Sequence, residues 1–201
     1  KDRIKALAER VPTSQPHWEA YLHTWLLGMV AHWQGKQSLT GNALVPLLIG
    51  RQGCGKSSFC RILLPKVLRD YYNDRINFKN ETDLNLGLTS FALINLDEFD
   101  KVSEKRQPDL KNLLQMMSVP VYRGKRLGYV TEPRLASFIA TTNSRQILSD
   151  PTGSRRFLCV EVTDMISEDP IDHKQLYAQL KQEVLNGERD YLNKEEKKEV
   201  Q

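Results

Sequence analysis

The chain has 201 residues, of which 40% are hydrophobic and 27% are charged, and its net charge is +4 at pH 7. These values are ordinary for a globular protein with one substantial core, alone or with a small helical addition, and repeats and low-complexity segments are absent. No run approaches the ~18 apolar residues that a membrane-spanning helix needs, which argues against a membrane protein. Because the sequence begins Lys1-Asp2-Arg3, with neither an initiator Met nor a signal peptide, we expect a piece of a longer protein.

The cysteines indicate a reducing compartment. Cys54, Cys60 and Cys159 are odd in number and form no C-x-x-C pair. This spacing argues against a disulfide framework and against a zinc site. We therefore expect a cytoplasmic protein that makes no contact with a membrane.

The N-terminal segment predicts helices. Apolar residues recur at steps of three and four over residues 18–33, which is typical of an amphipathic helix. The apolar stripe, which we expect to pack against a core, includes all three tryptophans: Trp18, Trp25 and Trp33. A shorter helical pattern covers residues 4–11, and turn-forming residues follow near 35–41. Residues 1–40 are thus predicted to form an N-terminal helical section.

A phosphate-binding pattern follows a short apolar strand. Residues 50–57 read G-R-Q-G-C-G-K-S, which fills the pattern G-x-x-x-x-G-K-[ST]. In such a loop the glycines let several N–H groups point at a phosphate chain, while Lys56 adds positive charge and Ser57 a magnesium ligand. Pro46 cannot donate to a central ladder, so we place it first in the strand, before residues 47–49. The predicted nucleotide contacts are Gly50, Gln52, Gly53, Cys54, Gly55, Lys56, Ser57 and Ser58.

Strands and helices alternate after this loop. The predicted elements are a helix over residues 58–69 that Pro65 can shorten, a β-like piece at 75–79, apolar strands at 91–96, 135–142 and 156–162, a hairpin at 121–130, and helices at 104–117 and 174–187. This alternation predicts an α/β fold of the P-loop NTPase type, in which helices flank a parallel sheet. Residues 41–165 would form the ATPase core, and residues 166–201 a C-terminal helix with a charged tail.

Acidic and amide side chains end two of the predicted strands. Asp97 can hold magnesium through water, and Glu98 can orient or deprotonate the water that attacks a γ-phosphate. Solvated acids often end strands, so this pair gains its meaning from the phosphate loop. Asn143 can hydrogen-bond the γ-phosphate or the attacking water, although a turn-capping role is an equal alternative.

Two adjacent arginines precede the last predicted strand. Neighbouring side chains point in different directions, so one of Arg155 and Arg156 can reach the γ-phosphate of a neighbouring subunit as an arginine finger. The other would anchor the turn, and the sequence does not distinguish the two. Arginines are also common where a loop meets a strand. The predicted catalytic set is Lys56, Glu98, Asn143, Arg155 and Arg156.

Positive charge is concentrated between residues 101 and 134. This window, which Arg134 ends, holds eight basic and three acidic residues. The tip of the predicted hairpin carries three of the cations: Arg123, Lys125 and Arg126. Such residues contact phosphates without reading bases, which favours sequence-tolerant and salt-sensitive binding of nucleic acid, with a solvated loop as the alternative. Tyr122 and Tyr129 flank the tip, where we expect packing rather than base stacking.

These motifs together resemble one family. The segments GRQGCGKSS, INLDEFD, VYRGKRLGY, FIATTN and LSDPTGSRRF occur in the order and rough spacing of the virulence-associated protein E family. That family is similar to superfamily 3 helicases and to the primase-helicases of phages, plasmids and mobile elements, within the AAA+ ATPases. The resemblance covers about residues 25–162. Its most specific part is the TTN segment followed by D-x-T-G-x-R-R-F.

The resemblance implies roles and partners. It assigns Lys56 and Ser57 to Walker A, Asp97 and Glu98 to Walker B, Asn143 to sensor 1, and Arg155 or Arg156 to the arginine finger. It also implies ATP and Mg²⁺ as cofactors, and a ring, expected to be a hexamer, whose hairpin before the sensor 1 strand touches single-stranded or forked DNA. An upstream primase module of the same polypeptide is a further implied partner, but these residues contain none, so primase activity is not assigned.

We therefore predict an ATP-hydrolysing motor domain of a helicase-like protein in the replication of a mobile element, phage or plasmid. Two other functions stay open. A nucleotide-dependent switch or scaffold would bind ATP without moving on nucleic acid, although it would not need the carboxylate of Glu98. A small-molecule kinase would need an acceptor pocket and an arginine-bearing lid, and no segment of the sequence predicts such a lid.

Overall fold

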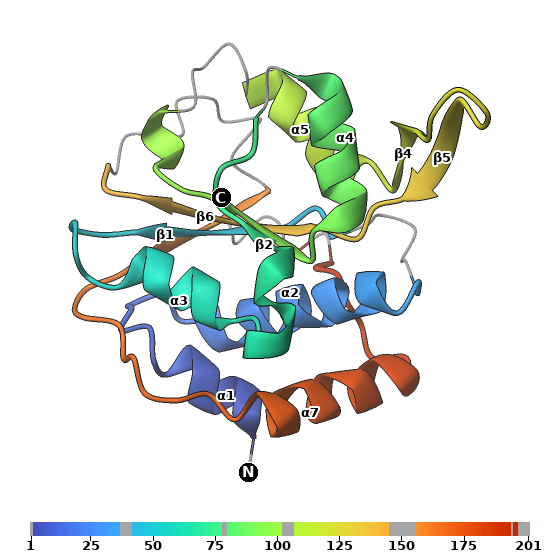
Figure 1. Ribbon diagram of the computed structural model, residues 1–201. Helices are drawn as coiled ribbons and strands as arrows, with labels where there is room; N and C mark the ends of the chain where they lie inside the picture. The colour runs from blue at the N-terminus through green and yellow to red at the C-terminus, as the bar shows by residue number, and fades with distance from the viewer. Residues whose placement is uncertain are drawn as a thin grey trace.

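A five-stranded sheet forms the centre of the protein in the computed structural model (Figure 1). Its order is β2-β3-β6-β1-β7, and its strands are β1 (Val45–Ile49), β2 (Tyr72–Asn73), β3 (Leu93–Leu96), β6 (Ser137–Thr142) and β7 (Phe157–Glu161). Every pairing in this sheet is parallel, so the carboxyl ends of the strands share one edge. The structure describes residues 2–36, 42–77, 80–101, 107–144, 156–193 and 195–196, without the side chains of 101, 107–109 and 111.

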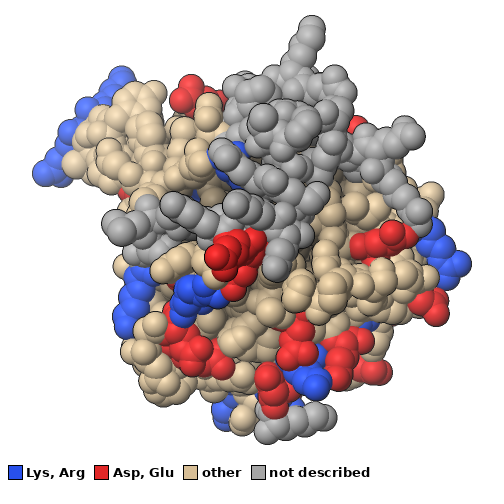
Figure 2. Space-filling model, turned by 180° about the vertical axis from the view of Figure 1, so that it is seen from behind, with Lys and Arg blue, Asp and Glu red and all other residues tan. Residues whose placement is uncertain are grey.

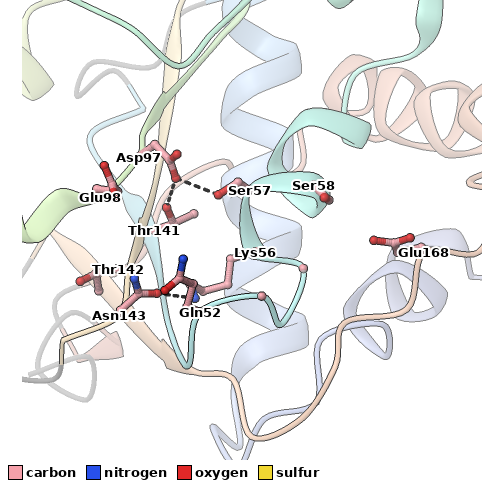
Figure 3. A pocket seen from close by; sticks show the side chains of 12 residues that line it. Gln52, Lys56, Ser57, Ser58, Asp97, Glu98, Thr141, Thr142, Asn143 and Glu168 are labelled. Atoms are coloured by element: carbon pink, nitrogen blue, oxygen red, sulfur yellow. Dashed lines mark hydrogen bonds between the residues drawn. The ribbon is translucent and has the colours of Figure 1, made fainter.

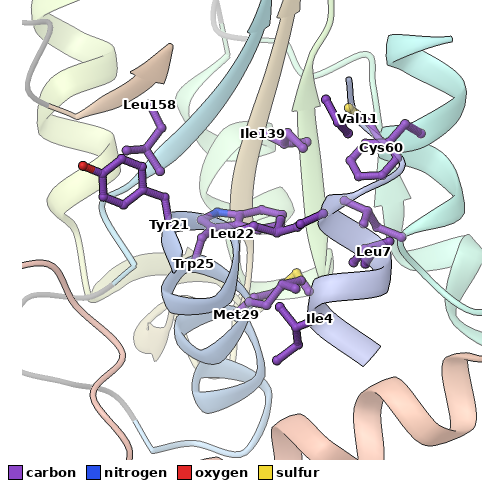
Figure 4. Packing of buried hydrophobic residues seen from close by; sticks show 14 of the residues in the cluster. Ile4, Leu7, Val11, Tyr21, Leu22, Trp25, Met29, Cys60, Ile139 and Leu158 are labelled. Carbon is purple, nitrogen blue, oxygen red and sulfur yellow. The ribbon is translucent and has the colours of Figure 1, made fainter. Parts of the chain in front are cut away.

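One face of the sheet is covered by helices from both ends of the chain (Figure 1). They are α1 (Arg3–Ala8), α2 (Trp18–Trp33), α3 (Lys56–Ile62) and α7 (His173–Leu185). Trp25 of α2 is fully buried, and its Nε1 donates to the carbonyl oxygen of Phe138 in β6 at 3.0 Å. Figure 4 shows Trp25 among the other buried side chains of this core. Trp18 is also buried and Trp33 packs on the same cluster, which confirms the predicted packing of the tryptophans.

Helix α2 is buried around most of its circumference rather than along one stripe. The sheet covers one side, while α1 and α7 cover the other. Leu27 and Ala31, which lie off the predicted stripe, are therefore buried as well. The N-terminal helices share one hydrophobic core with the strands, and the division of the chain at residues 40 and 165 stays a prediction.

The other face carries a second helical layer and a hairpin. The elements are α4 (Glu81–Ser90), the 3-10 turn η2 (Phe99–Lys101), α5 (Gln107–Gln115), and the antiparallel pair β4 (Ser118–Tyr122) and β5 (Tyr129–Pro133). The predicted hairpin is thus confirmed. Helix α4 was not predicted, and it begins where the Asn80 side chain accepts hydrogen bonds from the backbone N–H groups of Thr82 and Asp83.

Several boundaries differ from those that the sequence predicts. The helix after the loop ends at Ile62, before Pro65, and a 3-10 helix η1 (Lys66–Tyr71) follows. The strand expected at 75–79 is wrong over residues 75–77, because the chain pairs with β3 earlier, through β2, and residues 78 and 79 lie outside the described residues. Pro46 is the second residue of β1 rather than the first. Its nitrogen carries no hydrogen, and the register of β1 with β6 accordingly begins only at Leu47. The carbonyl oxygen of Phe138 in β6 accepts a hydrogen bond from Nε1 of Trp25.

Among the residues that the structure describes, no helix is both long and apolar enough to cross a membrane.

Candidate functional site

A glycine-rich turn joins β1 to α3 at the carboxyl edge of the sheet. Gly53 and Gly55 have φ of +80° and +92°, values that side-chain-bearing residues rarely adopt. A Cβ atom at Gly50 would lie 3.1 Å from the Cβ atom and the carbonyl oxygen of Val162, a tight approach that favours glycine at this position. The predicted phosphate loop is therefore a tight backbone turn whose conformation depends on its glycines.

Lys56 lies inside this turn. Its side chain is buried, and Nζ donates to the carbonyl oxygens of Gly50 at 2.7 Å and Arg51 at 2.8 Å. It also donates to Oδ1 of Asn143 at 3.0 Å. The structure thus brings the lysine of the loop into contact with the asparagine that follows β6, as Figure 3 shows.

The side chain of Asp97 lies beside the first turn of α3. Its Oδ1 accepts a hydrogen bond from Oγ of Ser57 at 2.8 Å and another from Oγ1 of Thr141. Asp97 follows β3, Ser57 follows β1, and Thr141 is in β6, the strand that lies between them. Thr141 is a site residue that the sequence did not reveal, because only the order of the strands places it between the other two.

Glu98 is held in a left-handed conformation. Its φ of +50° is the only positive value among the described non-glycine residues. Such a conformation costs roughly 1 kcal/mol or more, and it is often retained where it directs a functional side chain. The next part of the turn is fixed by Thr142, whose hydroxyl donates to Oδ1 of Asp100 at 2.9 Å.

These side chains line one cavity of about 310 Å³ (Figure 3). The lining includes nine predicted residues: Gln52, Gly53, Gly55, Lys56, Ser57, Ser58, Asp97, Glu98 and Asn143. Thr141, Thr142 and Glu168 also line it and were not predicted. Gly50 and Cys54 form the turn behind this surface, where Cys54 is buried.

Of the two predicted arginines, Arg156 is not among the residues that line this cavity. Arg155 lies outside the described residues. The carbonyl oxygen of Arg156 accepts a hydrogen bond from the N–H of Val45, the first residue of β1. The phosphate loop follows the other end of β1, about 16 Å away for a strand of this length. The backbone of Arg156 is therefore far from the loop of its own chain.

The hairpin projects away from the side of the sheet that carries the phosphate loop (Figure 1). Lys125 and Arg126 are exposed in its turn, and Figure 2 shows basic side chains at its outer end, at the upper left. Arg123 instead pairs with Glu132 across the hairpin, with both guanidinium contacts at 2.5 and 2.6 Å. The geometry leaves Lys125 and Arg126 as the more available cations.

Tyr122 and Tyr129 lie in contact, with ring centroids 5.3 Å apart. This cross-strand contact confirms the expected packing at the hairpin, although the residues are 46% and 70% exposed and the rings pack on each other rather than on the core. They sit directly below the hairpin turn that carries the cations.

One cation of the basic window faces the interior. Arg134 is fully buried, and its guanidinium donates to the carbonyl oxygens of Leu113, Leu114 and Asn42. Burial lowers the pKa of Arg134 to about 10. It holds the C-terminal end of α5 rather than contributing to a basic surface, so the charge count of this window overstated its exposed charge.

The fold and the site define a class of protein: an α/β domain with a glycine-rich, lysine-containing turn at the carboxyl edge of a parallel sheet. The family model of the virulence-associated protein E-like domain matches residues 1–201. The chain belongs to that family.

Solved structures of the NrS-1 C-terminal region have a similar fold. The apo structure of residues 305–718 has a TM-score of 0.61 and 17% identity, and the match covers 100% of this chain and 50% of that one. Two A-form apo structures have TM-scores of 0.57, with 18% and 16% identity, and cover 96% and 94% of this chain and 44% and 43% of theirs. The chain thus spans about half the length of these structures. No match was found among curated proteins.

Proposed function

We propose that this chain is the ATP-binding and ATP-hydrolysing motor domain of a helicase-like protein that acts on DNA during replication of a mobile element, phage or plasmid. The observation that carries the proposal is the pair of contacts at one cavity: Lys56 Nζ to Asn143 Oδ1 at 3.0 Å, and Ser57 Oγ to Asp97 Oδ1 at 2.8 Å. Residues from three strand ends converge where a γ-phosphate and its metal would lie.

The chemistry of the cavity fits a magnesium-bound triphosphate. The Ser57 hydroxyl and the Asp97 carboxylate supply the hard oxygen donors that Mg²⁺ prefers, and one or two protein ligands suffice when phosphates complete the coordination. No cluster of three metal-binding side chains occurs in the described part of the chain, which is compatible with this kind of site. When bound, Mg²⁺ would neutralise charge on the β- and γ-phosphate oxygens.

The protein side chains have separate roles in this proposal. Lys56 would donate to phosphate oxygens in place of its backbone carbonyl partners, and its contact with Asn143 supports a role for both side chains at the γ-phosphate. Glu98, directed by its left-handed backbone, orients the attacking water and accepts its proton. Thr141 holds the Asp97 carboxylate toward Ser57, which makes it a positioning residue.

A ring of subunits would complete the site. Arg156 directly precedes β7 at the end of the sheet opposite the loop of its own chain, so its guanidinium would serve a neighbouring subunit. Arg155 is the alternative finger. We propose a ring, with a hexamer as the expected form, in which each ATP lies between two subunits. A flanking primase module of the same polypeptide and a cytoplasmic location belong to the same proposal.

The hairpin supplies the contact with DNA in this account. Lys125 and Arg126 are exposed in the turn between β4 and β5, a hairpin that lies far from the start of α3 (Figure 1). In the proposed ring this turn would present them to the channel. They carry positive charge without a base-reading constellation, so binding to single-stranded or forked DNA would be tolerant of sequence.

A switch or scaffold ATPase remains the second candidate, and Glu98 distinguishes the two. A protein that only binds ATP needs no water-orienting carboxylate, whereas a motor does. ATP turnover should rise with single-stranded DNA in the wild type and be lost in Glu98→Gln while ATP affinity stays within about threefold. Turnover that is absent in the wild type, or unaffected by Glu98→Gln, would reject the motor. Transfer of phosphate to an added small molecule rather than to water would indicate a kinase.

A further inference from the structure

A segment that the sequence did not single out crosses the phosphate loop. Residues 163–170, here called the strap, connect β7 to α7. The N–H of Ile166 donates to the carbonyl oxygen of Cys54 at 3.0 Å, and a Cβ atom at Gly55 would lie 3.4 Å from Ile166. The strap is therefore packed directly against the turn that forms the phosphate site.

The N-terminal segment fixes the strap from its other side. The N–H of Ser167 donates to the carbonyl oxygen of Arg10 at 3.1 Å, and the Arg10 guanidinium donates to the carbonyl oxygens of Asp169 and Pro170. Backbone on both sides of Glu168 is thus held, so the fold fixes the backbone position from which its side chain extends.

Glu168 is the strap residue that lines the cavity. Its carboxylate is exposed and makes no hydrogen bond or ion pair within the described part of the chain. A carboxylate repels a phosphate, so this position is unsuited to the triphosphate itself. It is suited to a neutral group of the same ligand that donates hydrogen bonds.

The order of the side chains along the cavity indicates which part of the nucleotide lies beside Glu168. In Figure 3, Asp97, Glu98 and Asn143 lie on one side of the start of α3, while Glu168 lies on the other, with Ser58 between them. In the proposed function, Asp97, Glu98 and Asn143 surround the γ-phosphate, so their side of the cavity is the γ-phosphate end. A nucleotide laid in this direction passes its α-phosphate near Ser58 and brings its sugar to Glu168.

We propose that Glu168 accepts hydrogen bonds from the ribose hydroxyls of the bound nucleotide, so that this site selects ribonucleotides over deoxynucleotides. The inference rests on the proposed function and adds the sugar specificity of the same cavity. A carboxylate that binds ribose hydroxyls is a recurrent device in nucleotide sites, because it accepts from a hydroxyl that the deoxy analogue lacks. The cavity of about 310 Å³ is at the small end of ligand sites, which matches the phosphates and sugar with the base beyond.

The test compares affinities for ATP, 2′-deoxyATP and 2′,3′-dideoxyATP in the wild type, Glu168→Ala and Glu168→Gln. The wild type should prefer ATP by about fivefold to tenfold, the effect of a partly exposed hydrogen bond to a charged acceptor. Glu168→Ala should lose most of this preference through weaker ATP binding alone, while Glu168→Gln, which keeps an acceptor oxygen, should retain part of it. The control is Glu188→Gln, an exposed carboxylate beyond α7 that should keep the full preference.

The possible outcomes distinguish a failure of the proposed sugar contact from a failure of the proposed ATP-binding function. If the wild type binds ATP through Lys56 but the ratio of affinities is the same in Glu168→Ala, the sugar contact is overturned and the proposed function stands. An equal gain or loss of affinity for all three nucleotides in Glu168→Ala also overturns it, since that indicates general electrostatics. If the wild type binds no nucleotide, both the inference and the proposed function fail.

Discussion

The hydroxyl oxygen of Ser57 lies 2.8 Å from Oδ1 of Asp97, although 40 residues separate the two along the chain. The contact exists because β1 and β3 flank β6 in a parallel sheet, so the turns that follow them share one edge. Thr141 of β6 donates to the same carboxylate oxygen and completes the arrangement. Three strand ends thereby build a site that no single segment contains.

This arrangement predicts that Asp97→Asn weakens the binding of magnesium at the site. The amide keeps the size of the carboxylate but loses the charge that holds the cation. We expect the Mg²⁺ concentration needed for half-maximal ATP turnover to rise about 10- to 100-fold, as is typical when a metal contact is weakened. An Mg²⁺ titration checks this, with Asp70→Asn, on the exposed surface of η1, as the matched control. An unchanged titration curve would remove Asp97 from the proposed metal site.

The hairpin predicts a salt-dependent contact with DNA. In Lys125→Ala/Arg126→Ala, two phosphate contacts are lost, so the slope of log affinity against log salt for single-stranded DNA should fall in magnitude by about 1.4. Arg123→Ala should have a smaller effect, because Glu132 already neutralises that side chain. The control is Lys174→Ala/Lys181→Ala, which removes two exposed cations from α7. A slope that changes equally in both double variants would show only the effect of net charge.

The position of Arg156 predicts complementation between defective subunits. Arg156→Ala should lower turnover by about 10³-fold or more, as loss of an arginine finger does. Lys56→Ala should also be inactive, but for a different reason. Mixed oligomers of the two variants would contain some interfaces with an intact loop and an intact arginine, so part of the activity should return. The same mixture with Arg155→Ala identifies which arginine acts, and no recovery with either variant contradicts action in trans.

His32 predicts a loss of stability in acid. Burial, with a contribution from Arg134, lowers the pKa of His32 to about 4, and its Nε2 accepts a hydrogen bond from the N–H of Asn42. The unfolded chain therefore takes up a proton below about pH 6.5 that the native state does not. Stability from this group is complete above that pH and falls by about 2 kcal/mol on going to about pH 5.

Urea unfolding of the wild type and of His32→Gln, each at about pH 7.5 and about pH 5, isolates the contribution of His32 to the free energy of unfolding. Glutamine can still accept from Asn42 but does not titrate, so the variant should lose about 2 kcal/mol less than the wild type between about pH 7.5 and about pH 5. Equal losses would show that His32 titrates normally in the folded protein.

The sequence predicted those parts of the protein that depend on local patterns. The loop, the strand before Asp97 and the hairpin each carry their signal within a few residues, and the structure has all three. Helix α4 was missed because Gly87 and polar residues interrupt its apolar pattern, while its Asn80 cap is a common turn residue. The tryptophan packing was predicted, but not that α7 would bury the outer side of α2.

The parts that could not be predicted depend on contacts between distant segments. Glu168 has no motif around it, and only the hydrogen bonds of the strap to Cys54 and Arg10 bring it to the cavity. Arg134 looks like its basic neighbours in the sequence, yet it turns inward to the end of α5. A count of charges in a window does not say which side of the chain each one faces.

The central claim is that a triphosphate binds in the turn that holds Lys56. Its most direct test is calorimetric titration of ATP with Mg²⁺ into the wild type and Lys56→Ala, with Lys66→Ala as an exposed control and thermal unfolding as a check on folding. The account predicts that Lys56→Ala lowers ATP affinity at least about 100-fold while Lys66→Ala matches the wild type, since a charge-assisted contact to phosphate is lost at one site only. A folded Lys56→Ala protein with undiminished ATP affinity would contradict the account.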